Sequence, residues 1–358
     1  MAYYPLFAWL WKLSGLGPFG ISILNWCITL TSTFFISREL KIPLGQIVIF
    51  WSFPSAVFCM VPYSEALFIL GGAFILIGLH NNRLAILLIG VTLACLTRSI
   101  GAILSLCFLF TYIFNVSKSY STLDHLKSIS TIVLPVVING IVQWYQFYHS
   151  GVRFDYIDVQ AQWGRVLDFP GLPLTARLFP STAWVDYLAL FIGIASALLI
   201  LRLFYQKLSN TTLEIGQVPI FSLLYLAGVT CVVLLFSRKD GSGSTVIASL
   251  NRFVFASPYF LVFLNAMLTE AKSLTKKEVL LTMTVLLVLE WALLTFGVSM
   301  IMFHLKWQVY FVITLAVPLA YYLVLVKPKL TWWVPLYMIS TLLQAYFLGL
   351  FIAERWIG

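Results

Sequence analysis

The sequence predicts an all-α protein that crosses the membrane many times. Of its 358 residues, 61% are hydrophobic and only 10% are charged, and the mean hydropathy is +0.96. Soluble domains carry about 25% charged residues. The apolar stretches are long and lack the strict alternation that is typical of a membrane β-barrel. Because one helical span needs about 20 residues, the chain has room for about 10 to 12 spans.

Twelve apolar stretches are candidates for these spans, and we expect them to form one transmembrane domain over residues 1–358. In chain order they are 18–36, 43–61, 65–80, 84–97, 101–116, 128–148, 184–204, 217–236, 251–268, 279–297, 308–326 and 332–352. The fourth and fifth are short, because Arg98 and Gly101 interrupt what could otherwise be one broken helix. Residues 1–17 are too short to be assigned as a span, and their aromatic side chains are typical of an interfacial segment.

One long polar segment, 149–182, interrupts the series of helices, and we expect it to be an extracytoplasmic loop. A polar loop of this length in a membrane chain is usually functional. The formal net charge of +9 is attributed to basic cytoplasmic connections, so it does not indicate nucleic-acid binding. With the connection 37–41 placed inside, the basic segments 272–277 and 327–329 also lie inside, whereas the loop 149–182 lies outside.

Glu65 lies between two apolar runs, at the start of the predicted span 65–80. Charged groups at membrane depth are costly and tend to be functional. The same topology places Arg98, Arg252 and the polar loop on the outer face with it. Arginines above an apolar body suit a lipid-linked phosphate. A carboxylate beside them could act as a base or orient a sugar hydroxyl.

These residues also have structural interpretations. Glu65 could cap the following helix, since the helix dipole favours an acid near the N-terminus, and Arg98 could pair with Glu65 as a strut. Glu290 could be a hydrogen-bond partner between helices. The five cysteines and four histidines show no ligand spacing, and no phosphate-binding Gly-rich loop is present. We therefore expect no metal and no cofactor.

Several short motifs occur in a characteristic order. They are Pro62-Tyr63-Ser64-Glu65, Thr97-Arg98-Ser99-Ile100-Gly101, Ala161-Gln162-Trp163-Gly164-Arg165, Asn251-Arg252-Phe253 with Pro258, and the terminal Arg355-Trp356-Ile357-Gly358. Each motif alone is weak, but in this order and spacing they resemble those of the PIG-V-type mannosyltransferases and their bacterial relatives. The resemblance covers most of the chain, from Tyr4-Pro5-Leu6 to the end.

The resemblance implies a GT-C fold and a membrane glycosyltransferase. Such enzymes move a hexose, typically mannose, from a polyprenyl-phosphate sugar to a lipid-linked or glycan acceptor on the extracytoplasmic face. The implied partners are this donor, the acceptor and membrane lipids, without nucleic acid. We favour a bacterial plasma membrane over the endoplasmic reticulum. The rival interpretations are a transporter or flippase of a lipid-linked substrate, which should show internal repeats with broken helices, and a catalytically inactive scaffold subunit.

The resemblance also assigns site residues. Glu65 is the catalytic candidate, and the expected substrate-binding residues are Tyr63, Ser64, Arg98, Gln162, Trp163, Arg165, Arg252 and Trp356. In the family, a first span and a loop bearing an acid precede the aromatic-Pro-Leu segment. That segment begins here almost at Met1, so this span and loop are missing from the sequence. The resemblance therefore implies that the expected catalytic base lies upstream of this chain.

Overall fold

The computed structural model describes residues 4–116, 121–151, 160–162, 164–172, 174–175, 183–209, 215–271 and 330–353, and parts of 275–288. Four of its helices are long and apolar enough to cross a membrane. They are α2 (Pro18–Leu40), α7 (Thr122–Ser150), α9 (Ala183–Leu208) and α10 (Gln217–Leu235). The prediction of a helical membrane protein is confirmed at this level, whereas the number of spans stays a prediction. The candidate span 308–326, and most of 279–297, lie outside the described residues.

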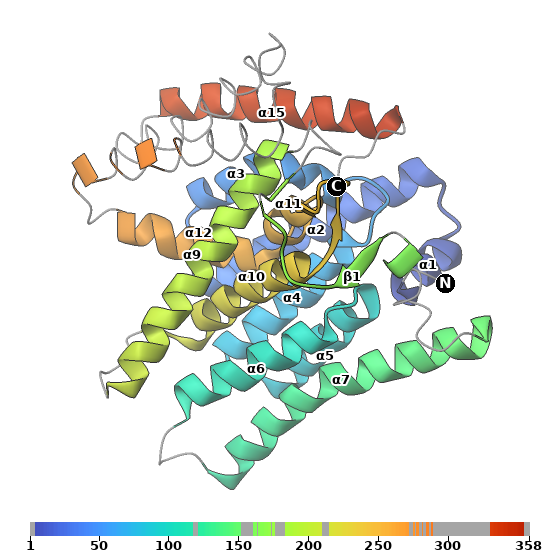
Figure 1. Ribbon diagram of the computed structural model, residues 1–358, viewed down its shortest axis with the longest axis vertical. Coiled ribbons are helices and arrows are strands. Elements are labelled where there is room, and N and C mark those ends of the chain that lie inside the picture. Colours follow the sequence, from blue (N-terminus) through green and yellow to red (C-terminus); the bar gives the residue numbers. More distant parts are fainter. Residues whose placement is uncertain are drawn as a thin grey trace.

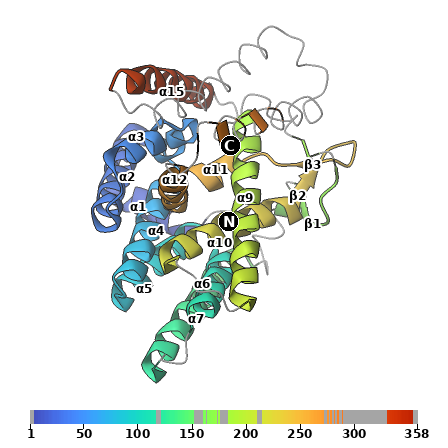
Figure 2. The same ribbon diagram turned by 90° about the vertical axis from the view of Figure 1, so that its left-hand side faces the viewer.

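Further helices complete the bundle (Figures 1 and 2). Their bounds are α1 (Pro5–Ser14), α3 (Leu44–Ser52), the 3-10 helix η1 (Pro54–Cys59), α4 (Glu65–His80), α5 (Leu84–Thr97), α6 (Gly101–Asn115), α11 (Leu250–Phe255), α12 (Pro258–Ala271) and α15 (Leu330–Ile352). In both views α15 lies toward one end of the longest axis and α7 toward the other. The helices α4, α5, α6 and α10 lie between them.

Two of the predicted spans are not single helices. The stretch 43–61 is divided into α3 and η1, because Phe53 is extended (φ −62°, ψ 137°) immediately before Pro54. The stretch 251–268 is divided into α11 and α12 ahead of Pro258. Proline disfavours a helical conformation in the residue before it and cannot donate a backbone hydrogen bond. A hydropathy pattern does not reveal these breaks, since most residues on both sides of each break are apolar.

A small antiparallel sheet is present that the sequence did not predict. It contains β1 (Arg165–Leu167), β2 (Phe236–Lys239) and β3 (Thr245–Val246), in the order β1-β2-β3. The strand β1 belongs to the predicted loop 149–182, and β2 follows α10 directly. A strand of three residues is too short to show an alternating pattern, so this small sheet within an otherwise helical fold was not predicted from the sequence.

The loop itself also begins later than predicted. The helix α7 continues to Ser150 and ends at Gly151, whose φ of 73° closes the helix in the left-handed region. Farther along, the backbone N–H of Thr175 donates to the carbonyl of Thr245, at 2.8 Å, and the side chain of Lys239 forms an ion pair with Asp168. The loop is therefore tied to the connection after α10.

The hairpin of α4 and α5 is closely packed, because glycines face each other across it. A Cβ atom added to Gly90 would lie 2.6 Å from the carbonyl oxygen of Gly71 and 2.6 Å from the backbone nitrogen of Ile75. Backbone atoms cannot move aside as the tip of a side chain can. This close contact fixes the position of α5 against α4, and with it the position of the residues at the C-terminal end of α5.

We predict that Gly90→Ala lowers the free energy of unfolding by about 1–3 kcal/mol, because the added methyl group forces the two helices apart. The control is Gly140→Ala in α7, where a Cβ atom would meet nothing within 4 Å. That change should leave stability unchanged or raise it slightly, since alanine favours the helix. Unfolding in mixed micelles measures both variants. Equal stability of the two would contradict the packing argument.

Candidate functional site

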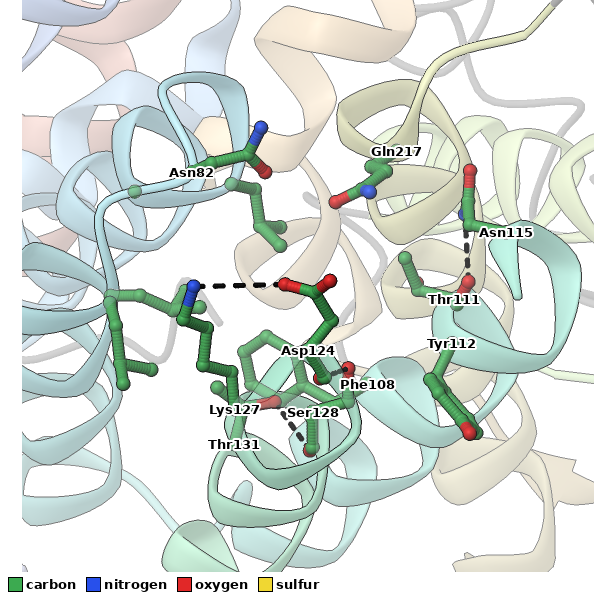
Figure 3. A pocket seen from close by; sticks show the side chains of 14 residues that line it. Asn82, Phe108, Thr111, Tyr112, Asn115, Asp124, Lys127, Ser128, Thr131 and Gln217 are labelled. Atoms are coloured by element: carbon green, nitrogen blue, oxygen red, sulfur yellow. Dashed lines mark hydrogen bonds and ion pairs between the residues drawn. The ribbon is translucent and has the colours of Figure 1, made fainter. Parts of the chain in front are cut away.

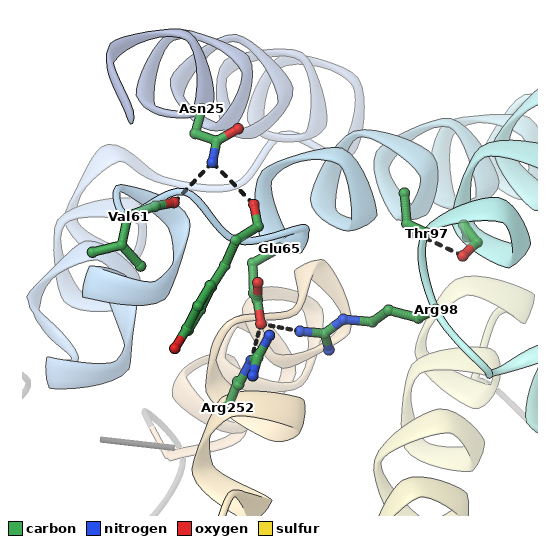
Figure 4. A network of polar contacts seen from close by, with 8 residues as sticks. Asn25, Val61, Glu65, Thr97, Arg98 and Arg252 are labelled. Atoms are coloured by element: carbon green, nitrogen blue, oxygen red, sulfur yellow. Dashed lines mark hydrogen bonds and ion pairs between the residues drawn. The ribbon is translucent and has the colours of Figure 1, made fainter. Parts of the chain in front are cut away.

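Glu65 is the first residue of α4, and its side chain is 0% exposed. Its Oε1 atom accepts hydrogen bonds from Nη2 of Arg98 and from Nε of Arg252, and both contacts are ion pairs (Figure 4). The structure thus confirms both the position of Glu65 at a helix N-terminus and its pairing with Arg98. The second arginine was not expected on the same oxygen. The three ionised side chains together carry one excess positive charge.

Aromatic rings enclose the two guanidinium groups. The Cζ atom of Arg98 lies 4.9 Å from the ring centroid of Phe68 and 5.1 Å from that of Phe253. The Cζ atom of Arg252 lies 4.3 Å from the ring centroid of Tyr63. A cation over a ring face is attracted to the electron-rich face of the ring. The rings also exclude water, so the charges of this site interact strongly.

Arg98 reaches the site because the chain changes direction between α5 and α6. The helix α5 ends at Thr97, and Arg98 is extended (φ −148°, ψ 154°). The next helix begins at Gly101, where a Cβ atom would lie only 2.6 Å from the carbonyl oxygen of Pro135 in α7. A glycine at this position lets α6 start against α7. The side chain of Arg98 is thereby directed toward α4 and not along the helix.

Arg252 is positioned by its neighbour Asn251, which a buried carboxylate holds. The Oδ1 atom of Asp186 in α9 accepts hydrogen bonds from the backbone N–H of Asn251, at 2.9 Å, and from its Nδ2, at 2.7 Å. The hydroxyl of Ser55 in η1 donates to Oδ1 of Asn251 at 3.0 Å. Both Asp186 and Asn251 are buried. This network fixes α11 between α9 and η1, with Arg252 facing Glu65.

Asp186 is the residue that sequence reasoning missed. Its signal was present, because it is an ionisable residue within the predicted span 184–204. The rule that draws attention to Glu65, that charges in spans are rare and tend to be functional, applies equally to Asp186.

The turn before α4 is held from α2. The Nδ2 atom of the buried Asn25 donates to the carbonyl oxygens of Val61, at 2.8 Å, and Tyr63, at 3.0 Å (Figure 4). This turn places the ring of Tyr63 against the guanidinium group of Arg252. Ser64 is the N-cap residue of α4, and its side chain makes no capping hydrogen bond. The structure thus brings together Tyr63, Arg98, Arg252 and Glu65.

Two loop residues of the predicted site, Gln162 and Arg165, do not contact Glu65 by a hydrogen bond or ion pair in the described part of the chain. Gln162 is exposed, and Arg165 in β1 is half-buried, with its Nη1 donating to Oε1 of Gln160 at 3.3 Å. Trp163 and Trp356 lie outside the described residues, as does Glu290.

A second ion pair holds the loop to the sheet. The hydrogen bond from the Lys239 ammonium group holds the pKa of the Asp168 carboxyl below its usual range, and the backbone N–H of Phe169 adds to this effect. Asp168 is therefore ionised at neutral pH. This pair is solvent-exposed, unlike that of Glu65, which makes it a useful reference.

Oε2 of Glu65 and Nη1 of Arg98 are buried, and neither forms a hydrogen bond of normal geometry with another described residue. The guanidinium group of Arg98 does interact with the buried hydroxyl of Tyr225. Buried polar groups are normally satisfied. The carboxylate of Glu65 thus retains one oxygen that could accept a hydrogen bond from a substrate. Within the described ranges, no group of three or more His, Cys, Asp or Glu side chains could hold a metal ion.

Comparisons of this chain with models of protein families, with curated proteins and with solved structures found no significant match.

We predict that Glu65→Gln lowers the free energy of unfolding by about 3–5 kcal/mol, because it leaves the buried guanidinium group of Arg98 and the partly buried one of Arg252 without their counter-charge. The double variant Glu65→Gln/Arg98→Met should lose less stability than the sum of the two single variants, since one uncompensated charge is removed. Unfolding in mixed micelles measures the cycle.

The control is Asp168→Asn, which breaks the exposed pair with Lys239 and should leave the free energy of unfolding nearly unchanged. Additive losses in the cycle would show that Arg98 and Glu65 are not energetically coupled.

Proposed function

We propose that this protein is a membrane glycosyltransferase that moves a hexose from a polyprenyl-phosphate sugar to a lipid-linked or glycan acceptor on the extracytoplasmic face. Mannose is the first candidate for the hexose. The proposal includes a GT-C fold with about 10 to 12 spans and a bacterial plasma membrane. The observation that carries it is the convergence of Arg98 and Arg252 on one buried carboxylate at the end of an apolar helix.

The two arginines suit the chemistry of the leaving group. When the bond between the anomeric carbon and the phosphate oxygen breaks, polyprenyl phosphate leaves with the electron pair and gains negative charge. Guanidinium groups bind phosphate oxygens with charge-assisted hydrogen bonds, and donors that are already in place stabilise this developing charge. The side chain of Arg98 is buried, so its charge would act on a phosphate with little screening by water. The polyprenyl tail would lie along the apolar surface of the helices.

Glu65 is assigned to positioning in this proposal. Its Oε1 accepts from both arginines, so the carboxylate holds the two guanidinium groups at a fixed separation. A carboxylate paired twice is a weak base, because taking up a proton would break both ion pairs. Its Oε2 remains able to accept a hydrogen bond from a sugar hydroxyl.

The reaction is a direct inverting transfer. The acceptor hydroxyl oxygen forms the new bond to the anomeric carbon, its proton passes to an acidic side chain at the outer face, and polyprenyl phosphate departs from the opposite side of the ring. A scaffold subunit would bind the same donor without transferring its sugar.

A transporter or flippase is the second candidate, because two interrupted helices meet beside the site. The hydrogen bond between Ser55 and Asn251 joins η1 to α11. The helix η1 follows the break in the predicted span 43–61, and α11 precedes the break in the predicted span 251–268. In many transporters, discontinuous helices form the substrate site. This candidate predicts movement of the lipid-linked sugar across the bilayer without a new glycosidic bond.

The test is a transfer assay in proteoliposomes with polyprenyl-phosphate mannose as donor and membrane lipids as acceptors. We predict that Arg98→Ala lowers the transfer rate by about 100-fold or more, as expected for losing a donor that stabilises transition-state charge. Glu65→Gln should lower it as well, because the arginines lose their common anchor. The exposed variant Asp168→Asn is the control.

Full transfer by both Arg98→Ala and Glu65→Gln would remove the site assignment. Movement of the labelled donor to the other leaflet, with no mannosylated product, would favour the transporter. Donor binding without product in the wild type would favour the scaffold.

A further inference from the structure

A separate cavity of about 360 Å³ lies at the end of α4 that is farthest from Glu65 (Figure 3). Gly78, which lines it, follows Glu65 by roughly 20 Å along the helix axis, at 1.5 Å per residue. The cavity is bounded by the ends of α4, α5, α6, α7 and α10. It therefore shares no residue with the Glu65 site and is not explained by the proposed transfer reaction.

One side of the cavity is polar. Asp124 and Lys127, one turn apart in α7, form an ion pair at 3.7 Å and are both partly exposed. Three amide side chains surround this pair: Asn82, Asn115 and Gln217. The lining also contains the apolar side chains of Leu79, Leu84, Leu87 and Phe108. A ligand for this cavity must therefore combine a polar part with an apolar one.

The cavity also contains a buried polar group that the protein does not use. Thr111 in α6 lines it and is only 4% exposed, yet its Oγ1 atom has no hydrogen-bond partner among the residues that the structure describes. A buried hydroxyl of this kind is unusual. It indicates a polar ligand atom at this wall of the cavity.

The helix ends give the cavity two opposite electrostatic sides. The helices α4 and α6 end here, near Asn82 and at Asn115, and a helix C-terminus favours positive charge. The helices α5, α7 and α10 begin here, the last at Gln217, and a helix N-terminus favours negative charge. The paired charges of Asp124 and Lys127 add to a net charge of zero. This arrangement suits a ligand that carries both charges.

We propose that this cavity binds the headgroup of a zwitterionic phospholipid with a primary ammonium group, namely phosphatidylethanolamine. The ammonium group donates hydrogen bonds to Oδ1 of Asp124, whose Oδ2 accepts from Ser121 in the capping box of α7. The phosphate is bound by Lys127 and by the helix N-termini. The apolar side chains that line the cavity contact the glycerol and the first acyl carbons.

Each other headgroup class meets a mismatch here. An anionic headgroup such as phosphatidylglycerol would face the carboxylate of Asp124 without a counter-charge of its own. A quaternary ammonium group, as in phosphatidylcholine, has no N–H to donate to that carboxylate and is bound best by aromatic cages. A primary ammonium group beside a phosphate matches both charges of the Asp124–Lys127 pair.

The experiment measures lipid retention by the purified full-length protein. The protein is exchanged into micelles that contain equal amounts of phosphatidylethanolamine, phosphatidylglycerol and phosphatidylcholine, washed, and analysed by native mass spectrometry. Phosphatidylethanolamine should be retained about tenfold more than either other lipid, the effect of one charge-assisted hydrogen bond. Asp124→Asn and Lys127→Gln should each remove about this preference.

The matched control is Ser121→Ala. This change breaks the same helix cap that Asp124→Asn disturbs, but Ser121 does not line the cavity. The control should therefore retain phosphatidylethanolamine, and a thermal unfolding curve for each variant separates loss of binding from loss of folding. Thr111→Val is a second probe, because it alters a wall of the cavity without touching the cap or the charges.

Equal retention of the three lipids, or an unchanged preference in both Asp124→Asn and Lys127→Gln, would overturn the proposal. Preferential retention of phosphatidylglycerol, or displacement of the lipid by inorganic phosphate alone, would also overturn it, since either would identify a simple anion site. The transfer assay reports on the opposite end of α4. Failure of that assay with intact lipid preference therefore refutes only the proposed enzyme activity.

Discussion

The arrangement of this bundle depends on the two ion pairs that the carboxylate of Glu65 forms. A charge buried among apolar helices is tolerated only with compensation, and Glu65 receives it from Arg98 and Arg252. These arginines belong to segments distant in sequence, the end of α5 and the short helix α11. The ion pairs therefore link elements that hydrophobic contacts alone would leave free to slide, because lipid tails are as apolar as the helix faces.

The rest of the core is arranged to keep these three side chains together. Asp186 holds Asn251 beside Arg252, Asn25 holds the turn before Glu65, and glycines allow the close approach of α4 to α5 and of α6 to α7. The breaks between α3 and η1 and between α11 and α12 serve the same arrangement. The two breaks allow η1 and α11 to meet, where Ser55 donates a hydrogen bond to Asn251 beside Arg252.

The two ends of α4 differ in chemistry. At its N-terminal end, fixed cations outnumber the one carboxylate between them, and aromatic rings exclude water. At its other end, a balanced pair of charges lies in an open cavity among helix termini of both polarities. Phosphate chemistry is common to both proposals. The first site suits a phosphate that gains charge during a reaction, and the second suits a phosphate that already has an ammonium partner.

The sequence by itself determined the membrane character and the positions of most helices, and it offered the pairing of Glu65 with Arg98 as one interpretation. Hydropathy and proximity to a helix start are local properties, so they can be read from neighbouring residues. Only the tertiary structure decided that Arg252 shares the same carboxylate oxygen, that Asp186 anchors α11 and that β1 pairs with β2. Each of these is a contact between segments far apart in the chain. Such contacts depend on how helices pack, and packing leaves no periodic pattern in either segment alone.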